Sequence, residues 1–248
     1  NRRIVDIISD VNMAYSEHAR RYLADCGLPK ERTYVTGSPM AEVLRRNLPE
    51  IEASDIHARL GLEKGRYILL SAHREENIDT DRNFISLFTA INRMAEKYDM
   101  PILYSCHPRS RKRLEQSGFR LDPRVIRHEP LGFHDYNCLQ MNAFAVVSDS
   151  GTLPEESSFF TSIGRPFPAV CIRTSTERPE AIDKACFFIA GIDTDSLLQA
   201  VDCAVEMNAN GDYGTPVPDY TDENVSTKVV KIIQSYTGIV DKMVWRKC

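Results

Sequence analysis

The chain has 248 residues, of which 42% are hydrophobic and 27% are charged, and its formal net charge at pH 7 is −4. This is an ordinary globular composition, and the length suits one large domain or one domain plus part of another. A net negative charge argues against general binding of nucleic acid, which usually requires a strongly basic domain. No apolar stretch approaches the roughly 18 residues of a membrane-spanning helix, so neither nucleic acid nor a membrane is expected as a partner.

The cysteines and glycines exclude several common kinds of site. The seven cysteines contain no CxxC pair, which excludes zinc ribbons and thioredoxin-like redox motifs. Several cysteines lie in apolar stretches, as small buried side chains do in a reducing compartment, so a cytoplasmic protein is expected. No two of the 12 glycines are separated by a single residue. The GxGxxG fingerprint of dinucleotide-binding proteins is therefore absent, and no Walker A loop is present.

Short apolar stretches alternate along the chain with segments of helical periodicity. Strands are predicted at 11–15, 66–72, 101–106, 144–148, 168–172 and 186–190. Helices are predicted at 1–10, 16–26, 54–62, 80–98, 109–116, 133–142, 153–162, 194–208 and about 222–236. This alternation indicates βαβ units and a parallel sheet covered on both faces, so the expected fold class is α/β.

Two features bear on where domains begin and end. Glycine and proline residues between Gly37 and Pro49 interrupt the pattern, so a domain boundary is expected near 48–65. The helical spacing of residues 1–10 has no preceding strand or turn, and no initiator methionine stands before it. We therefore expect the chain to be the back part of a longer protein.

Polar clusters follow four of the predicted strands. They occupy 73–77, 107–109, 149–156 and 173–180 and are rich in histidine, arginine and hydroxyl side chains. In open parallel sheets, ligands bind beyond the carboxyl ends of the strands. A solvated sheet edge is also polar but is seldom so rich in these side chains, so a ligand site is predicted at this edge.

The segment Ser150–Thr152 has the features of a phosphate-binding loop. It supplies backbone N–H groups and hydroxyls in front of a helix that Pro154 helps to begin, and the N-terminus of a helix attracts anions. Glu155 and Glu156 would repel phosphate, so at least one of them is expected to bind a neutral group such as a ribose diol. The alternative is a plain helix start, capped by a hydroxyl of this segment and with glutamate in its first turn.

Arginine and histidine side chains complete the expected site. Arg173 and Arg178 flank three hydroxyl residues, and guanidinium groups bind phosphate in a bidentate manner. Alternatively, Arg178 pairs with Glu177 in a surface loop. His73, next to Arg74, is the best candidate for chemistry, because a histidine with a pKa near neutrality donates or accepts a proton.

Three motifs resemble the non-hydrolysing UDP-N-acetylglucosamine 2-epimerases, in order and spacing, across essentially the whole chain. They are His73-Arg74-Glu75-Glu76-Asn77, Asp149-Ser150-Gly151 through Glu155-Glu156, and Thr176-Glu177-Arg178-Pro179-Glu180. The runs 170–178 and 107–109 are more similar to the UDP-N-acetyl-L-fucosamine synthase branch. The resemblance implies a 2-epimerase of bacterial capsule or O-antigen sugar biosynthesis. Its substrate would be UDP-N-acetylglucosamine or a 6-deoxy UDP-sugar that gives UDP-N-acetyl-L-fucosamine.

The resemblance also implies a glycosyltransferase-B-like fold, a homodimer, and a reaction without metal or redox cofactor. Residues 1–48 would end a first Rossmann-like domain, 49–220 would form the second, UDP-binding domain, and 221–248 would be a helix that crosses back. In the family reaction the C2 proton is removed and UDP is expelled, which gives a 2-acetamidoglycal. UDP then adds again while a proton reaches the opposite face of C2.

Motif positions imply one catalytic residue and a set of substrate-binding residues. His73 would stabilise or protonate the departing UDP, and Glu156 would bind the ribose hydroxyls. Leu131 replaces a glutamine, Tyr136 replaces a phenylalanine that helps to hold uracil, and Thr152 replaces a glycine of the diphosphate loop. The implied substrate-binding residues are Arg74, Leu131, Tyr136, Ser150, Gly151, Thr152, Glu156 and Arg178.

Two departures from the family pattern and two alternative functions remain. The carboxylates that handle the C2 proton in this family lie before residue 1, and the segment His107–Arg109 lacks an asparagine that is linked to activation by a second UDP-sugar. A glycosyltransferase of the same fold would use the same UDP site, but the motif Thr176–Glu180 disfavours it. A non-catalytic UDP-binding module is the second alternative, and the start of the chain favours it for these 248 residues.

Overall fold

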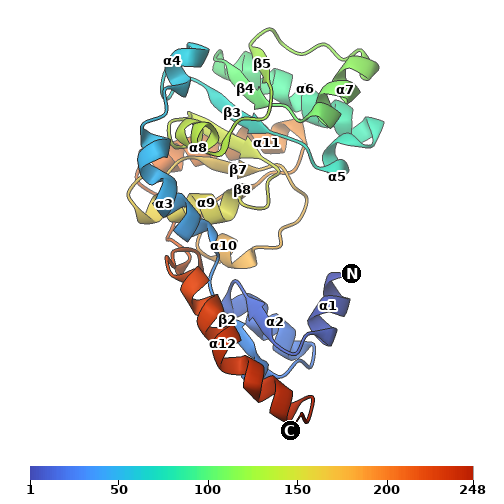
Figure 1. Ribbon diagram of the computed structural model, residues 1–248. Helices are drawn as coiled ribbons and strands as arrows, with labels where there is room; N and C mark the ends of the chain where they lie inside the picture. Colours follow the sequence, from blue (N-terminus) through green and yellow to red (C-terminus); the bar gives the residue numbers. More distant parts are fainter. Residues whose placement is uncertain (248) are drawn as a thin grey trace. The chain divides into compact units, whose positions relative to one another are not determined.

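The computed structural model describes residues 1–247, which form two compact units (Figure 1). The smaller unit comprises Asn1–Arg46 and the residues from Val217 onward, and the larger unit comprises Asn47–Pro216. Helix α3 (Met40–Glu52) begins in the smaller unit and ends in the larger one. Each unit contains a parallel sheet, so the predicted α/β class is confirmed.

The smaller unit is built on two short parallel strands. Its elements are α1 (Arg2–Ile8), β1 (Asn12–Ala14), α2 (Glu17–Asp25), a 3-10 turn (Lys30–Arg32), β2 (Thr33–Val35), a 3-10 turn (Pro218–Tyr220) and α12 (Val225–Met243). Helix α2 begins where the Ser16 hydroxyl accepts the N–H of Ala19. Tyr236 of α12 donates its hydroxyl hydrogen to the carbonyl of Glu31 and packs edge-on against Tyr34, which attaches the last helix to the sheet region.

The larger unit contains a six-stranded parallel sheet with the order β5-β4-β3-β6-β7-β8. The strands are β3 (Ile68–Ser71), β4 (Ile102–Ser105), β5 (Val125–His128), β6 (Ala145–Ser148), β7 (Ala169–Cys171) and β8 (Phe188–Ile189). The helices are α4 (Ile56–Leu60), α5 (Glu75–Ile78), α6 (Asp81–Tyr98), α7 (Pro108–Ser117), α8 (Phe133–Met141), α9 (Leu153–Ser162), α10 (Pro179–Asp183) and α11 (Thr194–Ala209). None of the helices within residues 1–247 is both long and apolar enough to cross a membrane.

Helices cover both faces of this sheet (Figure 1). Side chains alternate between the faces along each strand. Ile68 and Leu70 belong to a core cluster with α6 and α11, whereas Leu69, also fully buried, lies outside this cluster, as its alternate position in the strand requires. Strands buried on both faces form continuous apolar runs in the sequence, which is why the central strands were predictable.

Of the helices and strands within residues 1–247, five were not predicted from the sequence: β2, β5, α3 and the short helices α5 and α10. Strand β2 has only three residues, and β5 is an edge strand in which only Val125 is buried, so neither forms an apolar run. Helix α3 covers a segment that the sequence analysis interpreted as interrupted, and it contains Pro49. Ala41, Leu44 and Ile51 in this helix are 0% exposed, so burial of its apolar positions outweighs the local cost of the proline.

Gly214 is required where the chain passes the turn after α10. Its φ is +76°, and a Cβ at this position would lie 2.3 Å from the carbonyl oxygen of Ala185. Gly211 also has a positive φ, +87°, but its Cβ would meet nothing closer than 3.7 Å. We expect Gly211→Ala to lower the free energy of unfolding by about 1–2 kcal/mol, the cost of a left-handed backbone at alanine. Gly214→Ala should lower it by clearly more in urea unfolding, and equal losses would contradict a rigid backbone contact at Ala185.

Candidate functional site

Four loops that follow neighbouring strands meet at one edge of the larger sheet. Strands β4, β3, β6 and β7 are adjacent and parallel, so the residues after their C-terminal ends lie along the same edge. These loops contain the polar clusters 73–77, 107–109, 149–156 and 173–180. The prediction that the four clusters share one edge of a parallel sheet is therefore confirmed, and ligands of such sheets bind there.

A buried carboxylate joins two of these loops. Asp149, directly after β6, is 0% exposed, and its Oδ2 accepts the backbone N–H groups of His73 and Arg74 at 2.9 and 2.8 Å. The side-chain amide of Asn77 donates to the same oxygen at 3.1 Å. Arg74 also donates from Nε to the backbone carbonyl of Asp149 at 3.1 Å. The loop after β3 is thereby fixed to the loop after β6.

His73 faces the second oxygen of that carboxylate. Its Nδ1 lies 3.1 Å from Oδ1 of Asp149, and this buried oxygen accepts no hydrogen bond of good geometry from any described residue. The interaction with the Asp149 carboxylate raises the pKa of His73 against the smaller effect of burial. Burial raises the pKa of Asp149, but its contacts with His73 and Arg74 together outweigh burial and hold this pKa below its usual value. The two groups thus favour an imidazolium–carboxylate pair, while the His73 side chain remains 44% exposed.

The segment Ser150–Thr152 forms a turn in front of α9. The hydroxyls of Ser150 and Thr152 are 2.9 Å apart, and Ser148 Oγ accepts the N–H of Ser150 at 3.0 Å. Thr152 is the N-cap residue of α9, but its side chain makes no capping hydrogen bond. Its hydroxyl donates instead to Oε1 of Glu156 at 2.8 Å. The alternative interpretation, a helix start capped by a hydroxyl of this segment, therefore does not describe how Thr152 is used.

Glu156 is held from two sides inside the protein. Its Oε1 accepts the hydroxyl of Thr152, and its Oε2 accepts the side-chain amide of Gln140 at 2.8 Å. Glu156 and Gln140 are both buried, and burial raises the pKa of Glu156. Gln140 lies on α8 and is not among the predicted site residues, because no motif in the sequence marks it.

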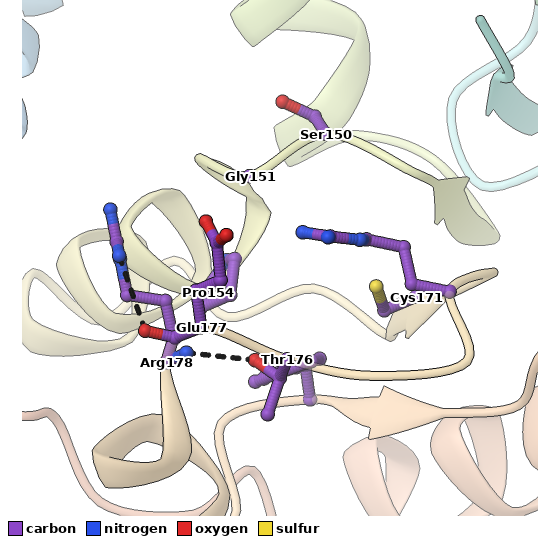
Figure 2. Close-up of a pocket in the computed structure, with 9 residues that line it drawn as sticks. Ser150, Gly151, Pro154, Cys171, Thr176, Glu177 and Arg178 are labelled. Atoms are coloured by element: carbon purple, nitrogen blue, oxygen red, sulfur yellow. Dashed lines mark hydrogen bonds between the residues drawn. The ribbon is translucent and has the colours of Figure 1, made fainter. Parts of the chain in front are cut away.

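A pocket lies between the Ser150–Thr152 turn and the loop after β7 (Figure 2). Its lining residues are Ser150, Gly151, Pro154, Cys171, Arg173, Thr176, Glu177, Arg178 and Phe187. Arg178 donates from Nε and Nη2 to Oε1 of Glu155 at 3.1 and 3.0 Å, and from Nη1 to the carbonyl of Glu177 at 3.3 Å. The carboxylate partner of Arg178 is thus the buried Glu155, a residue that sequence reasoning did not pair with it.

Guanidinium groups surround this turn. Arg173 lines the pocket, is 8% exposed and donates from Nε to Oε1 of Glu76 at 3.2 Å. A Cβ at Gly151 would lie 3.2 Å from Nη2 of Arg74, so the glycine leaves room for that guanidinium. Arg74, Arg173 and Arg178 therefore approach one short turn. Three planar, charged donors at one turn suit an anion with several oxygens, such as a diphosphate.

The remaining predicted residues lie on or before α8. Ser148 and Ser71 are hydrogen-bond neighbours of the Tyr136 hydroxyl, and burial raises the pKa of this tyrosine. Tyr136 therefore joins the network around Glu156, whose charge also acts on it. Leu131 is half-buried in the loop before α8 and does not line the pocket. Within residues 1–247, no group of three or more His, Cys, Asp or Glu side chains is arranged to hold a metal ion.

Comparison with known proteins gives a consistent result. A family model described as UDP-N-acetylglucosamine 2-epimerase matches residues 1–234. A curated UDP-N-acetylglucosamine 2-epimerase from Methanococcus maripaludis is 27% identical over 237 residues, which are 93% of this chain and 63% of that protein. The structure of UDP-N-acetylglucosamine 2-epimerase from Rickettsia bellii is 40% identical, with a TM-score of 0.88 over 100% of this chain and 65% of that chain.

A second solved structure carries ligands. UDP-GlcNAc 2-epimerase from Methanocaldococcus jannaschii, in complex with UDP-GlcNAc and UDP, is 26% identical, with a TM-score of 0.82 over 94% of this chain and 63% of that chain. The likeness to these structures confirms the predicted glycosyltransferase-B-like, Rossmann-type architecture. The chain spans less than two thirds of the length of the relatives described here. Because the family model matches nearly the whole chain, we conclude that the chain belongs to the UDP-N-acetylglucosamine 2-epimerase family, a family of isomerases.

Proposed function

We propose that the sheet edge at the Ser150–Thr152 turn binds the UDP part of a UDP-sugar, and that the protein is a UDP-N-acetyl-amino-sugar 2-epimerase. The observation that carries the proposal is the convergence of Arg74, Arg173 and Arg178 on this turn, at the N-terminus of α9. His73 lies beside Asp149, the residue directly before the turn. A diphosphate is stabilised by such a combination, because helix N-terminal N–H groups and guanidinium groups both donate to phosphate oxygens.

The nucleoside end of the ligand is assigned to the network around Glu156. Each carboxylate oxygen of Glu156 accepts one hydrogen bond from the protein, from Thr152 or Gln140, and each keeps a further acceptor position for a ribose hydroxyl. Tyr136, beside this network, supplies an aromatic face for uracil. Leu131 contributes through its backbone. The structure of a family member with UDP-GlcNAc and UDP supports the ligand class.

His73 stabilises the departing UDP in this proposal. The C2–H and C1–O bonds break, UDP leaves with the electron pair of the C1–O bond, and a 2-acetamidoglycal forms. UDP then adds again at C1 while C2 receives a proton on the opposite face. An imidazolium held by Asp149 places a positive charge and a proton where negative charge develops on UDP.

The C2 proton requires other residues. Glu75 and Glu76, the carboxylates closest to His73 along the chain, are paired with Arg109 and Arg173, so we assign neither of them to C2. We propose that carboxylates outside these 248 residues remove and return this proton. The chain by itself then binds UDP without exchanging the C2 proton of a UDP-sugar.

The finer parts of the proposal rest on the sequence resemblance. The runs 170–178 and 107–109 favour a 6-deoxy UDP-N-acetylhexosamine as substrate, with UDP-N-acetyl-L-fucosamine as product and a role in capsule or O-antigen synthesis. We further propose a cytoplasmic homodimer without metal or redox cofactor, in which 49–220 is the second Rossmann-like domain, 1–48 ends the first, and 221–248 is a helix returning to it. The compact unit Asn47–Pro216 supports this division. A glycosyltransferase or a purely binding protein is not favoured, because the family consists of epimerases.

Arg178 tests the assignment of the diphosphate. Arg178→Lys keeps a positive charge beside the buried Glu155 but removes the planar, bidentate guanidinium. We expect the affinity for UDP to fall about tenfold, the effect of losing one charge-assisted hydrogen bond, whereas the affinity for uridine stays unchanged in calorimetric titration. Arg82→Lys, at an exposed arginine of α6, is the matched control. Equal losses for UDP and uridine would contradict the assignment.

His73 tests the reaction. In a form of the protein as long as the curated relatives, His73→Asn should lower turnover about 10²-fold, the usual scale for acid–base catalysis, while UDP affinity changes much less. The assay is proton NMR of candidate UDP-sugars in D2O, where deuterium at C2 with inversion identifies both reaction and substrate. Exchange at C2 by the 248-residue chain alone would contradict the assignment of the proton-handling residues.

A further inference from the structure

We propose that Asp149 is a positioning residue for His73, which selects the imidazole tautomer with the proton on Nδ1 and leaves Nε2 as the nitrogen that meets the ligand. This inference rests on the proposed function, because it concerns how His73 is prepared for its role at the departing UDP. The ring has only two nitrogens, and Nδ1 is already placed 3.1 Å from Oδ1 of Asp149.

The two carboxylate oxygens of Asp149 have different surroundings. Oδ2 accepts three N–H groups, from the backbone of His73 and Arg74 and from the Asn77 side chain. Oδ1 accepts no hydrogen bond of good geometry from the described residues, and His73 Nδ1 lies 3.1 Å from it. Because the carboxylate is 0% exposed, water does not compete for Oδ1. A buried carboxylate oxygen needs a donor, and the ring N–H of His73 is the donor in reach.

The other groups around Asp149 do not replace the imidazole. Burial, and in addition the negative charge of Asp149, raises the pKa of three neighbouring groups, which are Tyr104 of β4, Tyr136 of α8 and Cys171 of β7. All three are therefore neutral near pH 7. Arg74 is the remaining cation, and its Nε binds the backbone carbonyl rather than the carboxylate. Protonation of His73 therefore responds chiefly to Asp149.

Asn77 provides the control that separates positioning from plain structural support. It donates to Oδ2 of Asp149 and to the carbonyl of Ile172, so it braces the same junction without facing His73. Asn77→Ala removes these two hydrogen bonds and keeps the negative charge of Asp149 beside His73. Asp149→Asn keeps an oxygen for the backbone N–H groups, removes the charge, and turns an amide N–H₂ toward the imidazole.

The test is NMR of the imidazole ring in the purified 248-residue chain. His73 is one of six histidines, and the signal missing in His73→Asn assigns it. In the unmodified chain above the pKa of His73, long-range proton–nitrogen correlation should show the proton on Nδ1. The pKa of His73 should fall in Asp149→Asn and stay near its original value in Asn77→Ala. Near-UV circular dichroism verifies that both variants fold.

Several results would contradict the proposed role of Asp149. A neutral His73 with its proton on Nε2 in the unmodified chain would overturn the inference without any variant of Asp149. So would a His73 pKa that is unchanged in Asp149→Asn or that falls equally in Asn77→Ala. The tautomer and the pKa do not depend on activity, so they test the inference even if C2 epimerisation is not found. Epimerisation by a longer form together with the wrong tautomer would reject this inference and leave the proposed function standing.

Discussion

At the junction of β3 and β6, one carboxylate with no exposure to solvent accepts three N–H groups and faces an imidazole. Removing one partner of a buried charge typically costs several kcal/mol, so Asp149 ties the two loops into one rigid unit. The rest of the candidate site depends on this tie. It sets where His73 stands, and it holds Arg74 so closely to Gly151 that a larger residue would have to displace the guanidinium.

The two acids in the first turn of α9 both have partners within the protein. Glu155 is neutralised by Arg178, and Glu156 accepts hydrogen bonds from Gln140 and Thr152. The acids in the first turn of α9 are therefore held by protein partners, and three guanidinium groups lie around the Ser150–Thr152 turn. A site of this kind favours a ligand with a dense negative charge next to neutral hydroxyls, as in a nucleoside diphosphate.

The sequence was most informative where physical constraints are local. Strands such as Ile68–Ser71, buried on both faces, appear as apolar runs, and the polar clusters that follow them mark the ligand edge. The helix containing Pro49 was missed, because its stability comes from distant packing rather than local preference. The roles of Asp149, Gln140 and Glu155 were missed for a similar reason. Their partners lie 76, 16 and 23 positions away in the chain, and only the order of the strands brings them together.

The central claim is that this edge binds the diphosphate of a uridine nucleotide. Backbone amide NMR of the 248-residue chain, titrated with UDP and separately with uridine, tests it most directly. The account predicts that UDP shifts the amides of Ser150–Thr152 and of His73 and Arg74, and that uridine leaves these signals in place while it shifts those near Tyr136 and Glu156. Identical shifts for the two ligands, or UDP-dependent shifts confined to other parts of the chain, would contradict it.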